Sequence, residues 1–350
     1  MSADATLWPD VIGALMRGES APSESIDRVM AKLLEGEATD AQIAGFAVAL
    51  RAKGETSEEL AVMVRAMLRH AQRVQVDAPE ALIDTCGTGG DRAGTINVST
   101  LAALIAAGAG ARVAKHGNRA ASSLCGSADV LETLGVIIDL GPAGVARCIE
   151  ETGIGFCFAP TFHPGLRFAA PTRRELGVRT TFNFLGPLAN PAGVRHQAMG
   201  VSDPSMAERM IGTLRELGAE HALVFYGHDG LDELTLTTTS TAFELRGGAI
   251  TTFEVDPAAL GLRVVDLGDL AGGDAATNAR VVREVLAGAP GPAREVALLN
   301  AAAALIVADL AADLPEGIER GAAAIDSGAA ARVLESFVHV STDARTREGS

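Results

Sequence analysis

From Ala81 onward, short apolar runs alternate with segments that have the apolar spacing of helices. Strand, crossover helix and strand in succession build a mostly parallel sheet with helices on both faces. Four apolar runs predict strands, at 81–83, 112–114, 154–158 and 222–226. Helices are expected at 99–109, 128–134, 142–152 and, rich in alanine, within 278–338. The stretch 234–253 instead predicts short β segments around a hairpin-like turn at Arg246-Gly247-Gly248.

The first seventy-odd residues predict helices only. Thr39-Asp40-Ala41-Gln42 and Thr56-Ser57-Glu58-Glu59 fit the capping-box pattern, and Lys53-Gly54 ends the first of these helices. We therefore predict an α/β fold class, a mostly parallel sheet with flanking helices plus a smaller all-helical domain. The expected domains are a helical domain at 1–75, joined by a hinge or helical segment at about 165–190, and an α/β domain at 80–345. The polar tail from Thr342 is expected to fray, with 346–350 outside the domain.

Charge and cysteine content exclude several classes of protein. The formal net charge is −15, so long-range attraction to nucleic acid or to an acidic membrane is not expected. The chain shows neither a membrane-spanning apolar run nor the basic start of a signal peptide, so we expect a soluble, cytoplasmic protein. The four cysteines are scattered and match no zinc or disulfide pattern. An anionic substrate would have to be held by loop N–H groups, a few basic side chains or a metal.

A glycine-rich loop follows the first predicted strand. The sequence Asp84-Thr85-Cys86-Gly87-Thr88-Gly89-Gly90-Asp91 is followed, about ten residues later, by Asn97-Val98-Ser99-Thr100 at the start of a helix. Three glycines allow positive φ and close approach of a ligand, and N–H groups beside a helix N-terminus form an anion site. The loop is neither a Walker A motif nor a Rossmann fingerprint. A plain connection with Ser99 as helix cap is the alternative, but the position at a strand's carboxyl end favours ligand binding.

A basic loop follows the second predicted strand. Residues 115–123 read Lys-His-Gly-Asn-Arg-Ala-Ala-Ser-Ser, a group that can bind phosphate oxygens without help from the overall charge. The alternative is a solvated basic turn. It is disfavoured because loops suited to ligand binding follow two adjacent predicted strands.

Two acidic side chains follow the strand at 222–226. Asp232 and Glu233, in Asp229-Gly230-Leu231-Asp232-Glu233, suit Mg²⁺, which prefers oxygen ligands and bridges to substrate phosphates. The Ser99 hydroxyl can serve the same ion. An acidic surface turn is the default reading of any Asp-Glu pair.

A segment rich in Arg and Pro separates these motifs. His163-Pro164 precedes a helical stretch with Arg173-Arg174-Glu175-Leu176-Gly177, and the Gly-Pro and Asn-Pro steps at 186–191 suggest a rigid turn between domains. An arginine here can pair with a carboxylate through two hydrogen bonds, and the alternative is a surface arginine with a packed stem.

Together these stretches resemble the anthranilate phosphoribosyltransferases of the tryptophan pathway over nearly the whole chain. The matching blocks stand in the family's order: G-T-G-G-D at 87–91, N-V-S-T at 97–100, K-H-G-N-R at 115–119, G-S-A-D-V-L-E at 126–132, R-R-E-L-G at 173–177, F-N-F-L-G-P-L-A-N-P at 182–191 and D-G-L-D-E at 229–233. Where the family has a basic residue followed by Ser, this chain has Leu124-Cys125. One cationic contact near the donor is therefore expected to be absent.

The resemblance implies transfer of the phosphoribosyl group of 5-phosphoribosyl 1-pyrophosphate (PRPP) to the amine of anthranilate, giving N-(5-phosphoribosyl)anthranilate and pyrophosphate. It implies Mg²⁺ as cofactor, an architecture shared with pyrimidine nucleoside phosphorylases, and a homodimer joined through the helical parts. The implied donor contacts are Gly87, Gly90, Asp91, Thr95, Asn97, Val98, Ser99, Thr100, Lys115, His116, Gly117, Asn118, Arg119, Ala120, Ala121, Ser122, Ser123 and Ser127. The implied anthranilate contacts are Gly87, Asn118, Arg173, His116, His163, Gly186 and Pro187. The implied metal ligands are Ser99, Asp232 and Glu233.

This reaction needs positioning and electrostatics more than a catalytic base. An aromatic amine is uncharged near pH 7, so we expect no Ser-His-Asp-type unit and no single catalytic residue. Two other functions remain open. A pyrimidine nucleoside phosphorylase would release a base with inorganic phosphate, and the blocks at 173–177 and 229–233 speak against it. A non-catalytic nucleic-acid-binding relative needs a basic groove, which a net charge of −15 disfavours.

Overall fold

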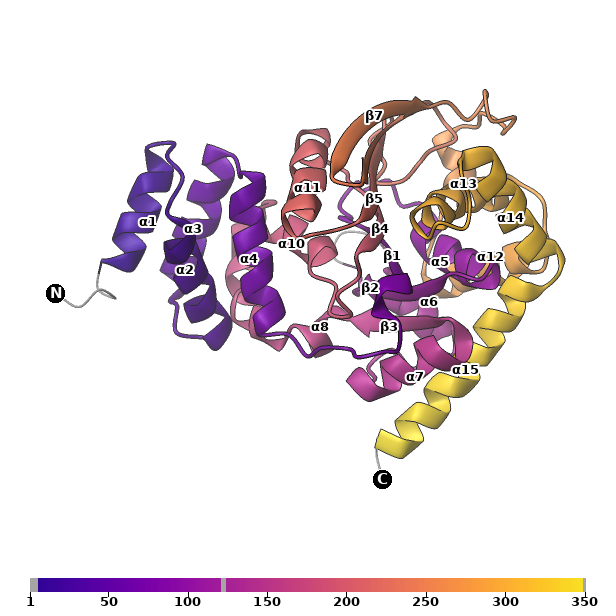
Figure 1. Ribbon diagram of the computed structural model, residues 1–350, viewed down its shortest axis with the longest axis horizontal. Coiled ribbons are helices and arrows are strands. Elements are labelled where there is room, and N and C mark those ends of the chain that lie inside the picture. The colour runs from indigo at the N-terminus through magenta and orange to yellow at the C-terminus, as the bar shows by residue number, and fades with distance from the viewer. Residues whose placement is uncertain (1–5, 121–123, 349–350) are drawn as a thin grey trace.

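The computed structural model describes residues 6–120 and 124–348. Its centre is a seven-stranded sheet in the order β3-β2-β1-β4-β5-β6-β7 (Figure 1). The strands are β1 (Leu82–Gly87), β2 (Arg112–Gly117), β3 (Ile154–Phe158), β4 (His196–Gly200), β5 (His221–Gly227), β6 (Ser240–Arg246) and β7 (Ala249–Val255). The first five are parallel, and β6 and β7 form an antiparallel hairpin that extends the β5 edge. The predicted α/β class is confirmed.

The strand order reverses between β1 and β4. From β1 the chain continues to β2 and β3 on one side, whereas β4 and β5 lie on the other. Two adjacent parallel strands whose connections lead in opposite directions leave a crevice at their carboxyl ends, where α/β proteins bind ligands. Strand β4 was not predicted from the sequence. Its residues, His-Gln-Ala-Met-Gly, carry no β-branched side chain, and it is a strand because β1 and β5 pair with it on both sides.

Four helices build the N-terminal part of the chain, as predicted. They are α1 (Leu7–Met16), α2 (Ser23–Glu35), α3 (Asp40–Lys53) and α4 (Ser57–Arg69). Thr39 and Thr56 make the expected capping boxes, with Gln42 and Glu59 as the reciprocal partners. Later in the chain, α8 (Ala159–Phe162), a 3₁₀ turn (Pro164–Phe168), α9 (Ala170–Leu176) and α10 (Phe182–Leu188) return to this helical end. The Thr172 hydroxyl, for example, donates to Asp40 at 2.8 Å.

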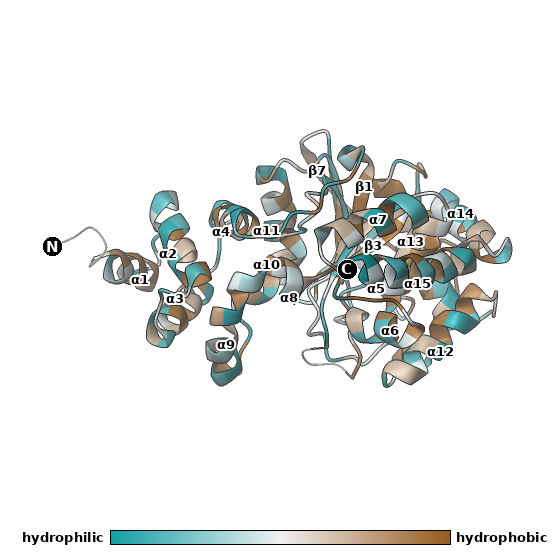
Figure 2. Cartoon of the chain, turned by 90° about the horizontal axis from the view of Figure 1, so that it is seen from below, coloured by the Kyte–Doolittle hydropathy of each residue, from teal (hydrophilic) through white to brown (hydrophobic). Residues whose placement is uncertain are grey.

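The remaining helices cover the sheet. They are α5 (Val98–Gly108), α6 (Ser127–Leu134), α7 (Pro142–Thr152), α11 (Pro204–Glu216), α12 (Ala275–Leu286), α13 (Pro292–Val307), α14 (Leu314–Asp326) and α15 (Ala329–Glu348). All except α11 contribute to one hydrophobic core on one face of the sheet, and α13 carries brown, hydrophobic stretches in Figure 2. On the other face, α11 and α10 join the N-terminal helices in a second core that also includes Met199 and Val224 of the sheet. The helical end is therefore packed directly against the back of β4 and β5.

Two expectations about helix limits were wrong. Residues 342–348, including 346–348 of the expected frayed tail, form the last turns of α15. The Glu348 carboxylate accepts hydrogen bonds from the backbone N–H groups of Gly141 and Gly144 at the start of α7, which holds the tail to the domain. The Gly186-Pro187 step, expected in a turn, lies inside α10, which ends one residue later at Leu188. No described helix is long and apolar enough to cross a membrane.

Candidate active site

Two glycines at the crevice between β1 and β4 define the floor of the site. Gly87 and Gly200 are register partners at the carboxyl ends of these strands, and the backbone of Asp232 passes over both. A Cβ at Gly200 would lie 1.6 Å from the Asp232 carbonyl oxygen, and one at Gly87 would lie 2.5 Å from its Oδ2. Only residues without a side chain allow this approach. The loop after β5 is thereby brought onto the glycine-rich loop after β1.

The glycine-rich loop presents backbone donors to this carboxylate. The N–H of Gly89 donates to Asp232 Oδ2 at 2.6 Å. Gly89 and Gly90 have φ of +63° and +81°, in the left-handed region that favours glycine. Successive N–H groups in a glycine-rich loop can form a concave anion site, and the Gly89 N–H here already bonds a carboxylate oxygen.

Three acidic side chains gather above the strand ends. Burial, together with repulsion from Asp91, raises the pKa of Asp232 above its ordinary value. Burial and the neighbouring Asp232 raise the pKa of Glu233 well above its ordinary value, although Glu233 accepts the backbone N–H of Ser99. Buried carboxylates that repel one another are stabilised by a divalent cation, and carboxylate and hydroxyl oxygens are the ligands that Mg²⁺ prefers. The donor set at Ser99, Asp232 and Glu233 therefore fits this metal.

A buried lysine joins the first two loops. Lys115, at the end of β2, is 1% exposed, and its Nζ donates to the carbonyl oxygen of Thr85 at 2.5 Å and to Ser99 Oγ at 3.2 Å. Burial lowers its pKa, whereas the charges of Asp84 and Glu233 oppose that shift. The predicted meeting of the basic loop with the glycine-rich loop and the acidic pair is thus observed at Lys115.

Below these loops lies a polar network that sequence reasoning missed. Asp84 is fully buried, and its Oδ1 accepts the backbone N–H of His116 at 3.0 Å, while its Oδ2 accepts Asn190 Nδ2 at 2.8 Å and Gln197 Nε2 at 3.3 Å. Burial raises the pKa of Asp84 to about 6, and Lys115 counteracts the rise. The network joins β1, β2, β4 and the Asn-Pro turn. Its only signal in the sequence is a charged residue at the end of an apolar strand.

The predicted acceptor residues meet beside this network. The rings of His116 and His163 lie 5.3 Å apart between centroids, and His116 donates to the carbonyl oxygen of Gly186. Burial lowers the pKa of His116 to about 3, so its imidazole is neutral at physiological pH. His163 Nε2 lies 2.8 Å from the carbonyl oxygen of Ala189, and Gln197 Nε2 donates to that of Pro187 at 2.7 Å. Helix α10 is thereby held against β2 and β4.

Two predicted donor residues bond to other parts of the protein, and the predicted acceptor residue Arg173 makes no side-chain hydrogen bond among the described residues. Arg119 pairs with Asp129 and Glu132 of α6, at 2.9 and 2.8 Å, rather than with the acidic cluster. Asn97 Oδ1 accepts Asn278 Nδ2 at 2.8 Å, and Arg173, on α9, has no polar side-chain partner among the described residues. Burial lowers the pKa of Arg173, which nevertheless stays charged.

The other predicted donor residues lie on the same loops or directly beneath them. Thr95 forms an isolated β-bridge with Ala271, and Ser127 Oγ donates to the carbonyl oxygen of Asn118 at 3.3 Å. The side chains of Val98 and Thr100 are buried in the interior, so only their backbone groups could reach a ligand. A Cβ at Gly117 would lie 2.3 Å from Ser127 Oγ, and the N–H of Ala120 donates to Asp129. Three predicted contacts lie outside the described residues: Ala121, Ser122 and Ser123.

Leu124 and Cys125, which replace the basic residue and Ser of the family pattern, lie in the loop that precedes α6. The side chain of Leu124 is 80% exposed and contributes no charge to the site. Cys125 is buried, and its Sγ lies 3.4 Å from Asn97 Oδ1. Cys125 therefore packs behind the loop.

Cavity size does not identify this site. A cavity of about 10 Å³ lies under it, between Glu233, Ser99 and Asn300. A larger one, about 300 Å³, lies between the β5–β7 edge and the start of α14 and is lined by apolar residues such as Leu223, Phe253 and Leu314. The larger cavity holds none of the clustered loops, so the site is assigned from the convergence of charged groups at the strand ends.

The chain is similar to known proteins over nearly its full length. Residues 79–331 match a family model described as the a/b domain of a glycosyl transferase family, and residues 9–71 match the helical bundle domain of the same family. An anthranilate phosphoribosyltransferase of Roseiflexus castenholzii is 54% identical over 95% of this chain and 98% of the relative. The crystal structure of the Thermus thermophilus enzyme of that name matches with a TM-score of 0.90 and 42% identity, covering 95% of this chain and 99% of the other. The Saccharomyces cerevisiae enzyme in complex with PRPP and Mg matches with a TM-score of 0.88 and 29% identity, covering 97% and 99%.

Proposed function

Because the chain belongs to the anthranilate phosphoribosyltransferase family, we propose that it transfers the phosphoribosyl group of PRPP to the amine of anthranilate. The products are N-(5-phosphoribosyl)anthranilate and pyrophosphate. The observation that carries the proposal is the convergence of Gly89, Lys115, Asp232 and Glu233 at the carboxyl ends of β1, β2 and β5. Positive and negative groups meet here in an otherwise very acidic protein, as a pyrophosphate with its counter-ion requires.

Mg²⁺ fits the acidic cluster and would be held by Ser99, Asp232 and Glu233. The mutual repulsion and burial of the two carboxylates support this ligand set. The yeast relative was solved in complex with PRPP and Mg. When bound, the ion would offset the negative charge that develops on the departing pyrophosphate.

The donor is assigned to the loops after β1 and β2. Backbone N–H groups of the glycine-rich loop and the ammonium of Lys115 stabilise charge on the pyrophosphate oxygens as the bond to C1 of the ribose breaks. The predicted donor contacts on 87–100 and 115–127 belong to this proposal. Arg119 differs from the others, because its side chain is paired with the α6 carboxylates. We propose that it contacts the donor through its backbone.

The acceptor is assigned to the space beside His116, His163, Gly186 and Pro187, with Arg173 as partner of its carboxylate. A neutral His116 suits this role, because an imidazolium would add charge beside an uncharged amine nucleophile. The yeast relative was also solved in complex with 4-fluoroanthranilate. The amine attacks C1 while the residues around it fix its orientation and exclude water, and positioning supplies most of the rate.

The wider context of the enzyme is part of the same proposal. The product is an intermediate of tryptophan biosynthesis, and the enzyme is placed in the cytoplasm as a homodimer joined through its helical end. The proposed domains are a helical domain at 1–75, completed by residues of about 165–190, and an α/β domain from 80 onward, to which α15 adds its turns as far as Glu348. The separate cores of the two ends support this division.

The direct test mixes the purified protein with PRPP, anthranilate and MgCl₂ and follows the loss of anthranilate fluorescence. Donor-dependent loss is expected, and its absence in an otherwise folded protein refutes the proposed function. Replacing Asp232 and Glu233 together by Asn and Gln should abolish the response to Mg²⁺. Glu254→Gln, on the exposed outer strand β7, is the matched control and should retain the wild-type response. A double variant with the wild-type Mg²⁺ response would disprove the metal assignment.

A further inference from the structure

The peptide between Gly89 and Gly90 is a weak point of the donor loop. Both flanking residues are glycines with positive φ, so rotation of this peptide meets little steric resistance. The peptide is planar and trans, so its carbonyl and its N–H point in opposite directions. Whatever fixes the Gly89 carbonyl therefore also fixes the direction of the Gly90 N–H. Within the described residues no acceptor contacts that N–H, which leaves it available to a ligand.

Arg179 and Ser202 hold this carbonyl. Arg179 Nη2 donates to the carbonyl oxygen of Gly89 at 3.0 Å and to Ser202 Oγ at 2.9 Å, and Ser202 Oγ donates to the same carbonyl at 2.7 Å. A Cβ at Gly90 would lie 3.1 Å from Arg179 Cζ, so the guanidinium lies against the loop itself. Thr88 joins them, because its Oγ1 accepts the backbone N–H of Ser202 at 3.1 Å.

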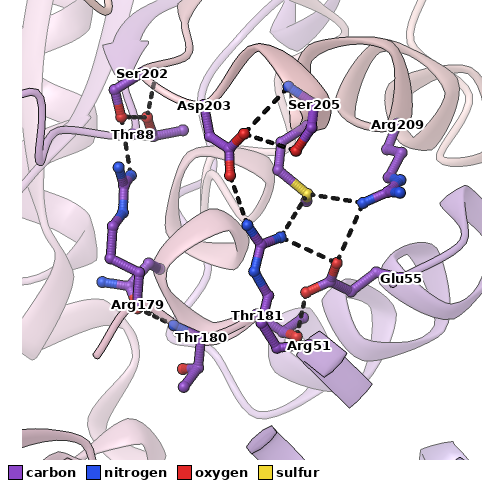
Figure 3. A network of polar contacts seen from close by, with 12 residues as sticks. Arg51, Glu55, Thr88, Arg179, Thr180, Thr181, Ser202, Asp203, Ser205 and Arg209 are labelled. Carbon is purple, nitrogen blue, oxygen red and sulfur yellow. Dashed lines mark hydrogen bonds and ion pairs between the residues drawn. The ribbon is translucent and has the colours of Figure 1, made fainter. Parts of the chain in front are cut away.

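The guanidinium is in turn anchored to the helical end of the molecule. Arg179 and Arg51 of α3 both lie about 5 Å from the ring centroid of Phe184, at 5.2 and 5.1 Å. Arg51 pairs with Asp203, the residue after Ser202, at 2.5 Å, and with the buried Glu55 at 3.2 Å (Figure 3). Arg179 and Arg51 thus both lie against the Phe184 ring. They bind two adjacent residues that follow β4, Ser202 and Asp203.

We propose that Arg179 is a positioning residue for the pyrophosphate end of the donor. It holds the Gly89 carbonyl against Ser202, and through the rigid peptide plane it directs the Gly90 N–H into the anion site. This inference rests on the proposed function, since PRPP is the ligand whose pyrophosphate that N–H would meet. We do not assign Arg179 a catalytic role, because its Nη2 donates to the Gly89 carbonyl and to Ser202 Oγ and acts on the donor through the loop.

The test compares Arg179→Met with Arg179→Lys and with Arg174→Met, a control on an exposed arginine of α9. The methionine keeps the packed stem and removes both hydrogen bonds. Titration calorimetry with PRPP and Mg²⁺, without anthranilate, should show affinity about tenfold or more weaker, the scale of losing a charge-assisted hydrogen bond. Lysine retains the positive charge and can still donate a hydrogen bond, but it lacks the guanidinium fork. It should therefore restore part of the PRPP affinity. The KM for anthranilate should stay within about twofold of wild type.

The outcomes separate this inference from the proposed function. Wild-type protein that neither binds PRPP nor consumes anthranilate refutes the proposed function, whatever Arg179 does. An active wild type whose Arg179→Met variant binds PRPP as tightly as Arg174→Met does would overturn the positioning role. A variant that loses PRPP and anthranilate affinity equally, with a lower Tm and no recovery by lysine, would overturn it too, because that pattern indicates general loss of structure. Combining Arg179→Met with Ser202→Ala should give less than additive losses, since both groups hold one carbonyl.

Discussion

Gly200→Ala probes the closest backbone contact in the site. The glycine lies at the end of β4 with φ outside the left-handed region, so alanine is compatible with its backbone and the effect is purely steric. The added Cβ would lie 1.6 Å from the Asp232 carbonyl oxygen and 2.5 Å from the carbonyl carbon. Ordinary contacts are about 3.4 Å or more, so the Asp232 backbone must retreat by roughly 2 Å. That movement takes the carboxylate away from the Gly89 N–H.

The expected cost follows from overpacking. Forcing such a contact destabilises a folded domain by about 2–4 kcal/mol, against a gain of about 0.4–1 kcal/mol from stiffening the unfolded chain. Urea unfolding followed by circular dichroism should show a lower midpoint with an unchanged m-value. The Mg²⁺ concentration needed for half-maximal activity should rise in the same variant, because the carboxylate that we propose as a metal ligand has moved.

Two further glycines make the reasoning refutable. Gly87→Ala meets the Asp232 side chain first, with Oδ2 at 2.5 Å and Cγ at 3.3 Å, and a side chain can rotate, so its stability cost should be about 1 kcal/mol while the Mg²⁺ response is still impaired. Gly268→Ala has no neighbour within 4 Å and should be at least as stable as wild type. If Gly200→Ala unfolds at the same urea concentration as Gly268→Ala, the argument from the Asp232 contact fails.

Three other predictions concern the pH dependence, the acceptor and the C-terminal helix. Burial raises the pKa of Asp84 to about 6 from 3.8. The fold therefore favours the protonated form, and this group removes roughly 3 kcal/mol of stability as pH rises from about 4 to about 6. The Asp84→Asn variant has no such titrating group. The difference in unfolding free energy, wild type minus variant, should therefore fall as pH rises from about 4 to about 6. A difference that stays constant with pH would contradict the raised pKa of Asp84. Arg173→Met should raise the KM for anthranilate about tenfold and leave PRPP affinity unchanged, whereas equal effects on both substrates would exclude the assigned carboxylate contact. Glu348→Gln should destabilise the protein by about 0.5 kcal/mol in low salt, because the charge at the start of α7 is lost, and an unaltered urea midpoint would rule out that cap.

Local rules predicted much of the fold. The capping boxes at Thr39 and Thr56 were found because their signals lie within four residues of each helix start. The helix at 142–152 has a proline near its start and a left-handed glycine directly after it, and its predicted limits are confirmed. Strand β4 was missed because its neighbours β1 and β5, rather than its own side chains, make it a strand. The helix at 342–348 was missed because its anchor, at Gly141 and Gly144, is some two hundred residues away in the sequence.

The candidate site divides in the same way. The glycine-rich loop, Lys115 and the Asp232-Glu233 pair were predicted from residue type and from their positions after strands. The contacts of Arg179 with the Gly89 carbonyl were not, because an arginine between two helices carries no local mark of its partner. The buried state of Asp84 and the neutral state of His116 were equally out of reach, since desolvation depends on everything that surrounds a group in three dimensions.

By itself, then, the order of residues determined the chemistry available to this protein: flexible backbone donors, one lysine and paired carboxylates, each at the end of a strand. The tertiary structure decided which of them meet. The reversal of strand order between β1 and β4 brings Gly87 and Gly200 together and lets Asp232 pass over both. Secondary structure depends on neighbours along the chain, whereas this meeting depends on how strands from distant segments pair in the sheet.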